Sequence, residues 1–483
     1  MRLTPERGFV LFLFALAAAL SVATATDPDL WWHLRTGELI LNDGIPTEDV
    51  FSFTVAGTDW VAHEWGSQVL LWGLWQAGGA TALIVTFTAL VTATFVMAYR
   101  TSRARPVITA SVVVLAAAAA RIATAPRPQM FNLALLAGLI LLFEKVRSGS
   151  VPARWVWVAV PLVAVWANLH SGYLLGVVTI AVYALGERAE RASGGRPMPT
   201  IAVRQLPWVA AASLGAAVIN PSGPALWTYP IETLRSPAMR TYIREWHSPD
   251  FHSSWFWPFG LLLLLAAGSM LASPRRPGWT QLMLISGTAV ASLQSMRHIP
   301  LFAVVAVPIV AEQLEVALDA HRAKRATRSG FGSPRIVAAL STALGAVVVL
   351  MITSAAISNN DDAVAGFYPV DAVDVLLDSE LADQPGYNAY GWGGYLIWRD
   401  VPVFIDGRAD VYGDEFMYLY FQAEDAEPGW REPLDQFDIQ WVLLPPDADL
   451  GVVLDEASDW TSIYEDGTAE IFARCRHACP VVG

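Results

Sequence analysis

Charged side chains that border the apolar stretches of this chain are the ones best suited to chemistry. Asp27 and Asp29 flank a proline directly after the first apolar run, and Arg121, Arg127 and Arg297 lie at or near the ends of later runs. A carboxylate at a membrane surface can act as a general base towards a hydroxyl group. An arginine in an apolar stretch is costly, so it is a functional candidate, with phosphate binding as the expected role. The alternative is a side chain that extends to the membrane surface to reach water.

Further polar residues near these positions are candidates for substrate binding. They are His33, Asp49, His63, Glu64, His170, Glu245 and His298. Histidine can bind ligands or transfer protons near neutral pH, and Glu245 is a candidate second acid.

Several of these residues have a simpler structural interpretation. Asp27 would cap the start of a predicted surface helix, with Pro28 at the first helical position. This helix is predicted to end at Gly44. Asp49 is typical of a turn, and His170 of a helix end. The adjacent His63 and Glu64 would need a third ligand, such as His33, to bind a metal, so the sequence leaves a divalent cation open.

Long apolar segments predict a polytopic helical membrane protein. A membrane-spanning helix needs about 20 mostly apolar residues, and its backbone amides must be satisfied internally. The predicted spans are 8–26, 79–99, 107–124, 130–146, 155–169, 172–186, 206–220, 256–273, 279–296, 300–317 and 336–358. The first of these also resembles a signal peptide with a small-residue cleavage site, but the residues after it look functional and need an anchor.

Charge predicts the orientation of these eleven spans. Residues 357–483 hold 26 acidic residues against 5 arginines, which gives them a charge of −21. Because the whole chain carries −13, residues 1–356 carry +8. With the N-terminus inside, 19 of those 26 preceding Lys and Arg residues fall in inner loops. The sequence therefore predicts a cytoplasmic N-terminus and an extracytoplasmic acidic domain. Nucleic-acid binding is not expected, because no folded basic face is evident.

The predicted domains are a membrane domain, residues 1–356, with outer loops at 27–78 and 221–255, and an α/β domain at 357–483. In the first loop we expect the surface helix at its start, a second helix at 66–77 and a short strand around 51–55.

In the tail we expect a helix from Pro369 to about Ala382, strands at 395–398, 401–405 and 440–444, and a hairpin of 462–464 with 470–472. Cys475 and Cys479 could form a small disulfide loop in an oxidising compartment.

Several motifs resemble a bacterial, glycosyltransferase-like branch of the GT-C superfamily of membrane glycosyltransferases, and the resemblance extends over nearly the whole chain. They are Asp27-Pro-Asp-Leu-Trp-Trp-His-Leu-Arg-Thr-Gly, Gly44-Ile-Pro-Thr-Glu-Asp-Val-Phe-Ser-Phe-Thr, His63-Glu-Trp, Arg127-Pro-Gln, Trp166-Ala-Asn-Leu-His, Glu245-Trp-His-Ser-Pro, Arg297-His-Ile-Pro and Val403-Phe-Ile-Asp-Gly-Arg-Ala-Asp.

This resemblance implies transfer of a sugar from a polyprenyl-phosphate donor to a glycan, lipid or protein acceptor, at the outer face of a bacterial plasma membrane. Asp27 or Asp29 matches the position of the family's catalytic acid, although the family's adjacent acidic pair is missing here. The arginines would hold the lipid phosphate in a cavity beside the first outer loop. Some branches of the family use a divalent cation and others do not. Two alternatives are a flippase or transporter for lipid-linked sugars and a non-catalytic membrane assembly protein.

Overall fold

The computed structural model describes residues 4–322 and 334–475, and the chain forms two compact units. The first, which we call the helical unit, comprises Met1–Ala23, Leu83–Trp227 and Glu245–Ile357. The second, which we call the mixed unit, comprises Thr24–Ala82, Thr228–Arg244 and Ser358–Gly483. The predicted outer loop at 27–78 thus belongs to the same compact unit as the acidic tail.

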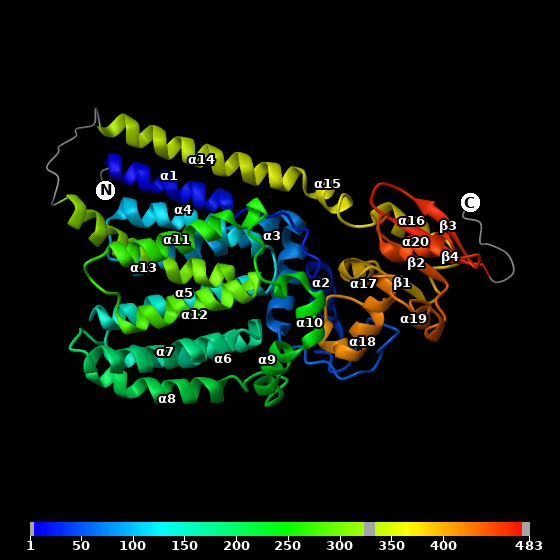
Figure 1. The fold of residues 1–483 in the computed structure, drawn as a ribbon, viewed down its shortest axis with the longest axis horizontal. Coiled ribbons are helices and arrows are strands. Elements are labelled where there is room, and N and C mark those ends of the chain that lie inside the picture. Colours follow the sequence, from blue (N-terminus) through cyan, green and yellow to red (C-terminus); the bar gives the residue numbers. More distant parts are fainter. Residues whose placement is uncertain (1–3, 323–333, 476–483) are drawn as a thin grey trace. The chain divides into compact units, whose positions relative to one another are not determined.

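Near-parallel helices build the helical unit (Figure 1). They are α1 (Pro5–Leu20), the later part of α3 (Trp65–Thr101), α4 (Pro106–Ala120), α5 (Gln129–Arg147), α6 (Ala159–Leu169), α7 (Tyr173–Ala192), α8 (Thr200–Ala216), α11 (Trp257–Ala272), α12 (Trp279–Gln294), α13 (Ile299–Arg322) and α14 (Pro334–Ser358). Short 3-10 helices lie at their ends: η1 (Arg121–Ala123), η2 (Ala153–Val158), η4 (Ser254–Phe256) and η5 (Met296–His298).

Helix α13 is the centre of this bundle, because it packs against α4, α5, α11 and α12. Helix α14 is mostly exposed and rests on α1, where Gly8 and Gly345 leave no room for a side chain. A Cβ atom on Gly8 would lie 2.4 Å from the Cα of Ala338, and one on Gly345 would lie 2.8 Å from the Cβ of Ala15. Such close approach through small residues is typical of helices packed within a membrane.

Each of the eleven predicted spans coincides with a helix of the bundle. Within the described residues, six helices are long and apolar enough to cross a membrane. The others are shorter or less apolar, so the prediction of eleven crossings stays a prediction.

The mixed unit contains shorter helices and one sheet. The helices are α2 (Leu30–Asp43), the first part of α3, most of α9 (Ala225–Arg235), α10 (Pro237–Tyr242), α15 (Asn360–Ala365), α16 (Val370–Leu377), α17 (Gly393–Trp398), α18 (Ala409–Glu424), α19 (Arg431–Gln436) and α20 (Asp449–Asp455), with the 3-10 helix η6 (Tyr390–Trp392). Of the 3-10 helix η3 (Arg244–Trp246), only Arg244 belongs to this unit, whereas Glu245 and Trp246 belong to the helical unit. Helix α3 is interrupted at Gly78 and Gly79, which separates its first turns from its apolar part. The predicted helix at 66–77 and the predicted span at 79–99 are thus two parts of α3.

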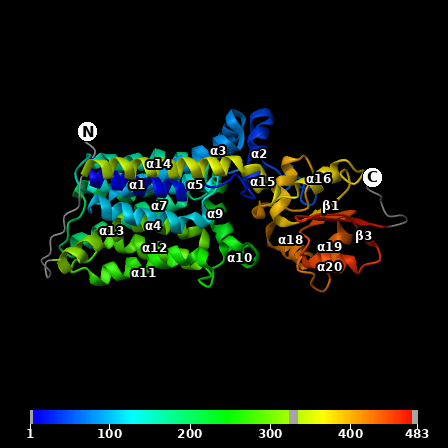
Figure 2. The same cartoon turned by 90° about the horizontal axis from the view of Figure 1, so that it is seen from above.

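The sheet has the strand order β1-β2-β4-β3, with β1 parallel to β2 and the other pairs antiparallel. Its strands are β1 (Gly386–Asn388), β2 (Trp441–Leu444), β3 (Trp460–Glu465) and β4 (Glu470–Arg474). Helices α16 and α20 lie on opposite sides of it (Figure 2). The predictions of β2 and of the β3–β4 hairpin are confirmed.

Three predicted strands of this unit were wrong, and one predicted helix was too long. Residues 395–398 belong to helix α17, and 401–405 and 51–55 are irregular segments that meet in a single parallel bridge between Ser52 and Val403. The predicted helix from Pro369 ends at Leu377, before Ala382. Cys479 lies outside the described residues, so its pairing with Cys475 stays a prediction.

Candidate functional site

Asp27 and Asp29 lie in the turn that precedes α2. The backbone N–H of Asp29 donates to Oδ1 of Asp27 over 3.1 Å, and the backbone N–H of Leu30 donates to the carbonyl of Asp27 over 3.0 Å. The helix therefore begins at Leu30 with Asp29 as its N-cap residue, and the predicted cap at Asp27 was two residues too early. Asp29 occupies the N-cap position without a capping bond from its side chain, and its Oδ1 instead accepts a 3.1 Å bond from Nε1 of Trp32.

Two glycines of the acidic tail allow its backbone to approach this turn. A Cβ atom on Gly407 would lie 2.0 Å from Oδ1 of Asp29, and one on Gly394 would lie 2.5 Å from the carbonyl of Pro28. A side chain at either position would push the segments apart. The Asp27-Pro-Asp motif and the Asp406-Gly-Arg-Ala-Asp motif therefore lie next to each other within the mixed unit, and Asp27 and Asp29 are half-buried there.

Glu64 brings together the two histidines of the first loop. Its carboxylate lies 3.6 Å from Nε2 of His33 and 3.3 Å from Nε2 of His63. The side-chain amide of Gln68 lies 3.4 Å from Nδ1 of His33. Three predicted site residues thus form one nearly buried group. Among the described residues, no three His, Cys, Asp or Glu side chains are arranged to hold a metal ion, so this group lends no support to a divalent cation.

Tyr229, an aromatic residue of the predicted outer loop 221–255, and Asp410, the last residue of the Val403–Asp410 motif, extend this cluster. The ring of Tyr229 lies 4.2 Å from that of His63, and the Tyr229 hydroxyl is hydrogen-bonded to Asp410. Burial lowers the pKa of His63, but the carboxylates of Glu64 and Asp410 outweigh it, so the pKa of His63 is raised. Burial, with Asp410 and Glu64, raises the pKa of Tyr229 well above its ordinary value. The cluster therefore favours a cationic His63 and a neutral Tyr229.

Asp49 belongs to a separate buried ion network. Its Oδ1 lies 2.6 Å from Nη1 of Arg408. The other terminal nitrogen of Arg408, Nη2, lies 2.6 Å from Oδ2 of Asp406. The backbone N–H and the hydroxyl of Ser52 donate to the other oxygen of Asp49, and the Tyr412 hydroxyl donates to Asp406 over 2.6 Å. These contacts hold the 49–52 turn against the tail and favour a structural role for Asp49. A role in substrate binding stays a prediction.

Arg127, Glu245 and Arg297 gather in the helical unit. Nη2 of Arg127, whose side chain is 7% exposed, lies 2.6 Å from Oε1 of Glu245. Arg127 also bonds Gln129, whose Nε2 donates over 3.4 Å to the carbonyl of Arg297. The guanidinium of Arg297 lies 4.6 Å from the ring centre of Trp246. Three motifs that are far apart in the sequence thus form one cluster, which we call the arginine cluster.

Electrostatics fix the charge of this cluster. Burial raises the pKa of Glu245, but Arg127 and Arg297 outweigh it and lower that pKa below its ordinary value. Glu245 is therefore ionised at neutral pH, and two arginines against one carboxylate leave a net positive charge. Because Arg127 is almost buried, this charge is poorly screened by solvent and can attract an anion.

The remaining candidates of the helical unit lie at helix ends. Arg121 is exposed in η1, 5.7 Å from the ring centre of Trp255, and η1 packs against η5, which carries Arg297. His170 follows α6 and is buried, and its Nδ1 accepts a 2.8 Å bond from the backbone N–H of Gly172. Nδ1 of His298 lies 3.3 Å from the carbonyl of Ala291. Arg121 thus neighbours the arginine cluster, whereas the contacts of the two histidines favour roles in ending helices.

Comparisons with known proteins identify the fold. No family model and no curated protein matches the sequence. The oligosaccharyltransferase AglB from Archaeoglobus fulgidus, solved with an inhibitory peptide and a dolichol-phosphate, is similar over 98% of this chain and 74% of its own, with a TM-score of 0.57 and 12% identity. ArnT from Cupriavidus metallidurans in the apo state is similar over 96% of this chain and 97% of its own, with a TM-score of 0.55 and 12% identity.

The chain has the GT-C fold. Its apolar helices and this fold make it a multi-pass membrane protein. The GT-C fold extends through almost the entire chain, so it includes the helices that carry the arginine cluster as well as the sheet of the tail. At 12% identity the likeness is one of fold.

Proposed function

We propose that this GT-C protein is a glycosyltransferase that moves a sugar from a polyprenyl-phosphate donor to an acceptor at the outer face of the membrane. The observation that carries the proposal is the likeness of fold, over 98% of the chain, to an oligosaccharyltransferase solved with a dolichol-phosphate. The likeness of fold and the two clusters are compatible with a glycan, a lipid or a protein as the acceptor.

In this proposal the arginine cluster binds the lipid phosphate. Arg297 and Arg127 offer guanidinium groups, which match phosphate oxygens in charge and geometry, and Arg121 lies on the adjacent 3-10 helix. Glu245 balances Arg127 when no phosphate is bound, and this prevents the cost of an isolated buried cation. The positive charge stabilises the phosphate as it leaves the sugar.

Asp27 and Asp29 are the proposed base candidates. One of them accepts the proton of the attacking acceptor group, while that group forms a bond to the sugar carbon and the bond from this carbon to the phosphate oxygen breaks. The polyprenyl phosphate leaves with the bonding electrons. We propose that His33, His63 and Glu64 bind a substrate near this turn, and that the cationic form of His63 holds Glu64 and Asp410 in place.

Binding of a polyprenyl monophosphate to the full-length protein in nanodiscs tests the role of the arginines. We expect Arg297→Gln and Arg127→Gln to weaken binding at least about tenfold, because each removes a charge-assisted hydrogen bond worth roughly 1.5–3 kcal/mol. Arg275→Gln is the matched control, since Arg275 is an exposed arginine of the same unit outside the cluster. Equal affinities for all three variants would contradict the assignment.

Substitution of the acidic pair tests catalysis separately. The double variant Asp27→Asn, Asp29→Asn should be expressed and bind polyprenyl monophosphate like the parent protein, while cells that depend on it lose the glycan product. Retained glycan output with both residues replaced would remove them as catalysts.

A further inference from the structure

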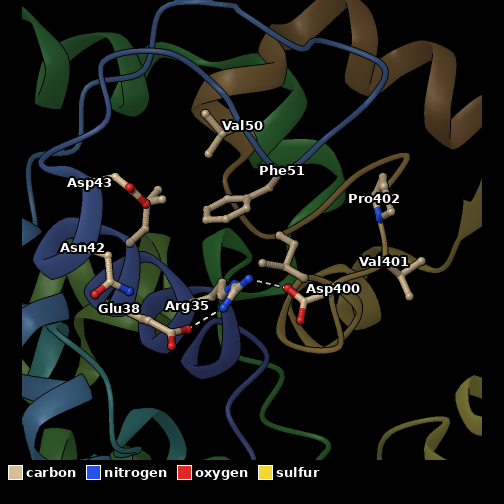
Figure 3. A pocket seen from close by; sticks show the side chains of 11 residues that line it. Arg35, Glu38, Asn42, Asp43, Val50, Phe51, Asp400, Val401 and Pro402 are labelled. Carbon is tan, nitrogen blue, oxygen red and sulfur yellow. Dashed lines mark hydrogen bonds and ion pairs between the residues drawn. The ribbon is translucent and has the colours of Figure 1, made fainter.

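A pocket of about 330 Å³ lies in the mixed unit between the later half of α2, the 50–51 turn and the segment after α17 (Figure 3). Its size is at the lower end of the range typical of small-molecule sites. Nothing in the proposed mechanism uses it. Its polar lining residues are Arg35, Glu38, Asn42, Asp43 and Asp400, and its apolar ones include Val50 and Phe51.

One side of the pocket is polar and net acidic. Arg35 pairs with Glu38 over 2.5 Å and with Asp400 across the pocket wall, so the guanidinium joins α2 to the tail segment (Figure 3). With Asp43, the lining has three carboxylates against one guanidinium, a net charge of −2. This charge disfavours phosphates and other anions and favours neutral or cationic ligands. Carboxylates accept bonds from ligand hydroxyl groups, whereas a guanidinium and an amide donate to them.

The other side is apolar and rigid. Its aromatic member is Phe51, whose ring lies 6.1 Å from that of Trp60 and 5.0 Å from the guanidinium of Arg408. Because Arg408 is 1% exposed and held by Asp49 and Asp406, Phe51 rests on a fixed support. A ligand that meets this wall therefore does not have to order it.

These two walls suit a molecule with hydroxyl groups at its edge and C–H groups on its faces. A saccharide ring has this distribution: its hydroxyls can bond the acidic wall and its C–H face can pack against Phe51 and Val50. A metal ion is a poor alternative, because among the described residues no three acidic or histidine side chains are arranged to bind one.

The position of the pocket on α2 separates it from the proposed base. The lining residues of α2, from Arg35 to Asp43, follow Asp29 by six to fourteen residues, which corresponds to about 9–21 Å along a helix. Asp29 does not line the pocket, so a ring bound there lies away from the group that reacts at Asp29. It would belong to a remote part of the same acceptor, whose binding energy lowers the barrier for the reacting end.

We propose that this pocket binds a neutral or amine-bearing saccharide of one or two rings, as a remote part of the acceptor. The assignment to the acceptor rests on the proposed transferase function, whereas saccharide binding itself does not. The acceptor is then a glycan or a molecule that carries one.

Saccharide binding to the full-length protein in nanodiscs tests this proposal. The probes are glucosamine, N-acetylglucosamine and its β-1,4-linked disaccharide, with glucuronic acid as the anionic comparison, measured by saturation-transfer NMR and titration. We expect saturable binding of the neutral and amine-bearing probes and at least tenfold weaker binding of glucuronic acid.

Two variants locate the binding. Val50→Trp should fill the pocket and abolish binding, and Asp43→Asn should weaken it about tenfold through loss of a charge-assisted bond. Both positions are exposed, so neither change should impair folding. Leu41→Trp is the matched control, because Leu41 is an exposed residue of the same helix that does not line the pocket.

Two results would overturn the proposal: no binding of any neutral or amine-bearing probe, or binding that Val50→Trp and Asp43→Asn leave unchanged. Polyprenyl monophosphate binding, measured on the same samples, keeps this outcome separate from the transferase proposal. If lipid-phosphate binding persists and saccharide binding is absent, only the pocket assignment fails. If saccharide binding persists and the arginine cluster does not bind lipid phosphate, the pocket is a saccharide site without the acceptor role.

Discussion

Glu424 has a pKa that its surroundings move into the physiological range. Its Oε2 accepts bonds from the hydroxyls of Tyr420, over 3.0 Å, and Tyr387, over 3.1 Å. Burial raises the pKa of Glu424 from an ordinary 4.5 to about 7, although the two tyrosine bonds oppose this shift. Because the pKa of Glu424 is raised in the folded state, the protonated side chain stabilises the fold. This contribution is complete below about pH 4.5 and is lost as the pH rises through about 7.

We therefore expect Glu424→Gln to remove part of the pH dependence of stability. Between pH 4.5 and 7, the free energy of unfolding of the parent protein should fall by on the order of 2 kcal/mol relative to that of the variant, after allowance for the partial exposure of Glu424. Thermal unfolding of both proteins in detergent across this range measures the difference. Glu415→Gln, at an exposed position of the same helix, should keep the parental slope. Parallel curves for the parent and Glu424→Gln would contradict the assigned pKa.

At the scale of residues, the sequence identified which groups are unusual but not which of them meet. His33, His63 and Glu64 could be named because polar residues in a tryptophan-rich loop are conspicuous. Their contact with Tyr229 and Asp410 could not be predicted, because both lie more than 160 residues further along the chain. Only the packing of the mixed unit brings these segments together.

Helices α2 and the first part of α3 approach each other closely at Gly37. A Cβ atom on Gly37 would lie 2.2 Å from the carbonyl oxygen of Gln68 and 2.8 Å from the Cβ of Trp72. Neither atom can move far, since one is helix backbone and the other is fixed to it. Gly37 thus sets the spacing of the two helices that hold Asp29, His33 and Glu64.

We expect Gly37→Ala to destabilise the protein by about 1–3 kcal/mol through overpacking and to reduce glycan output. Gly73→Ala is the matched control on α3, because a Cβ there meets nothing within 4 Å. In a helix interior this second change should be neutral or stabilising by up to about 1 kcal/mol. Thermal unfolding of both variants measures the contrast, and equal stabilities would show that the two helices can separate without cost.

Elements of the tail show where local patterns fail. The run Tyr395–Trp398 is apolar and aromatic, which favours a strand, but a short apolar run cannot be distinguished from a buried helix by its pattern. It forms α17, which packs on α2, and Gly394 provides the close approach that this packing needs. The β3–β4 hairpin was predictable because its alternation and its Asp466-Gly467 turn are local signals.

The number of membrane crossings decides on which sides the two ends of the chain lie. An odd number places the termini on opposite sides of the membrane, and an even number places them on the same side. Within the described residues, six helices are long and apolar enough to cross a membrane. Each of the eleven predicted spans nevertheless overlaps a helix. Charge discriminates between the two counts, since basic residues concentrate in the predicted inner loops and residues 357–483 carry a charge of −21.

We expect the chain to cross the membrane an odd number of times, with its N-terminus inside and its tail outside. A C-terminal alkaline phosphatase fusion should then be active and a C-terminal green fluorescent protein fusion dark, because the first folds only outside the cytoplasm and the second only inside. A fluorescent protein fused after Arg196, in a predicted inner loop, is the matched control and should be bright. A bright C-terminal fusion would place the acidic tail in the cytoplasm, on the side opposite to the proposed sugar transfer. Sugar transfer at the outer face of the membrane would then be contradicted.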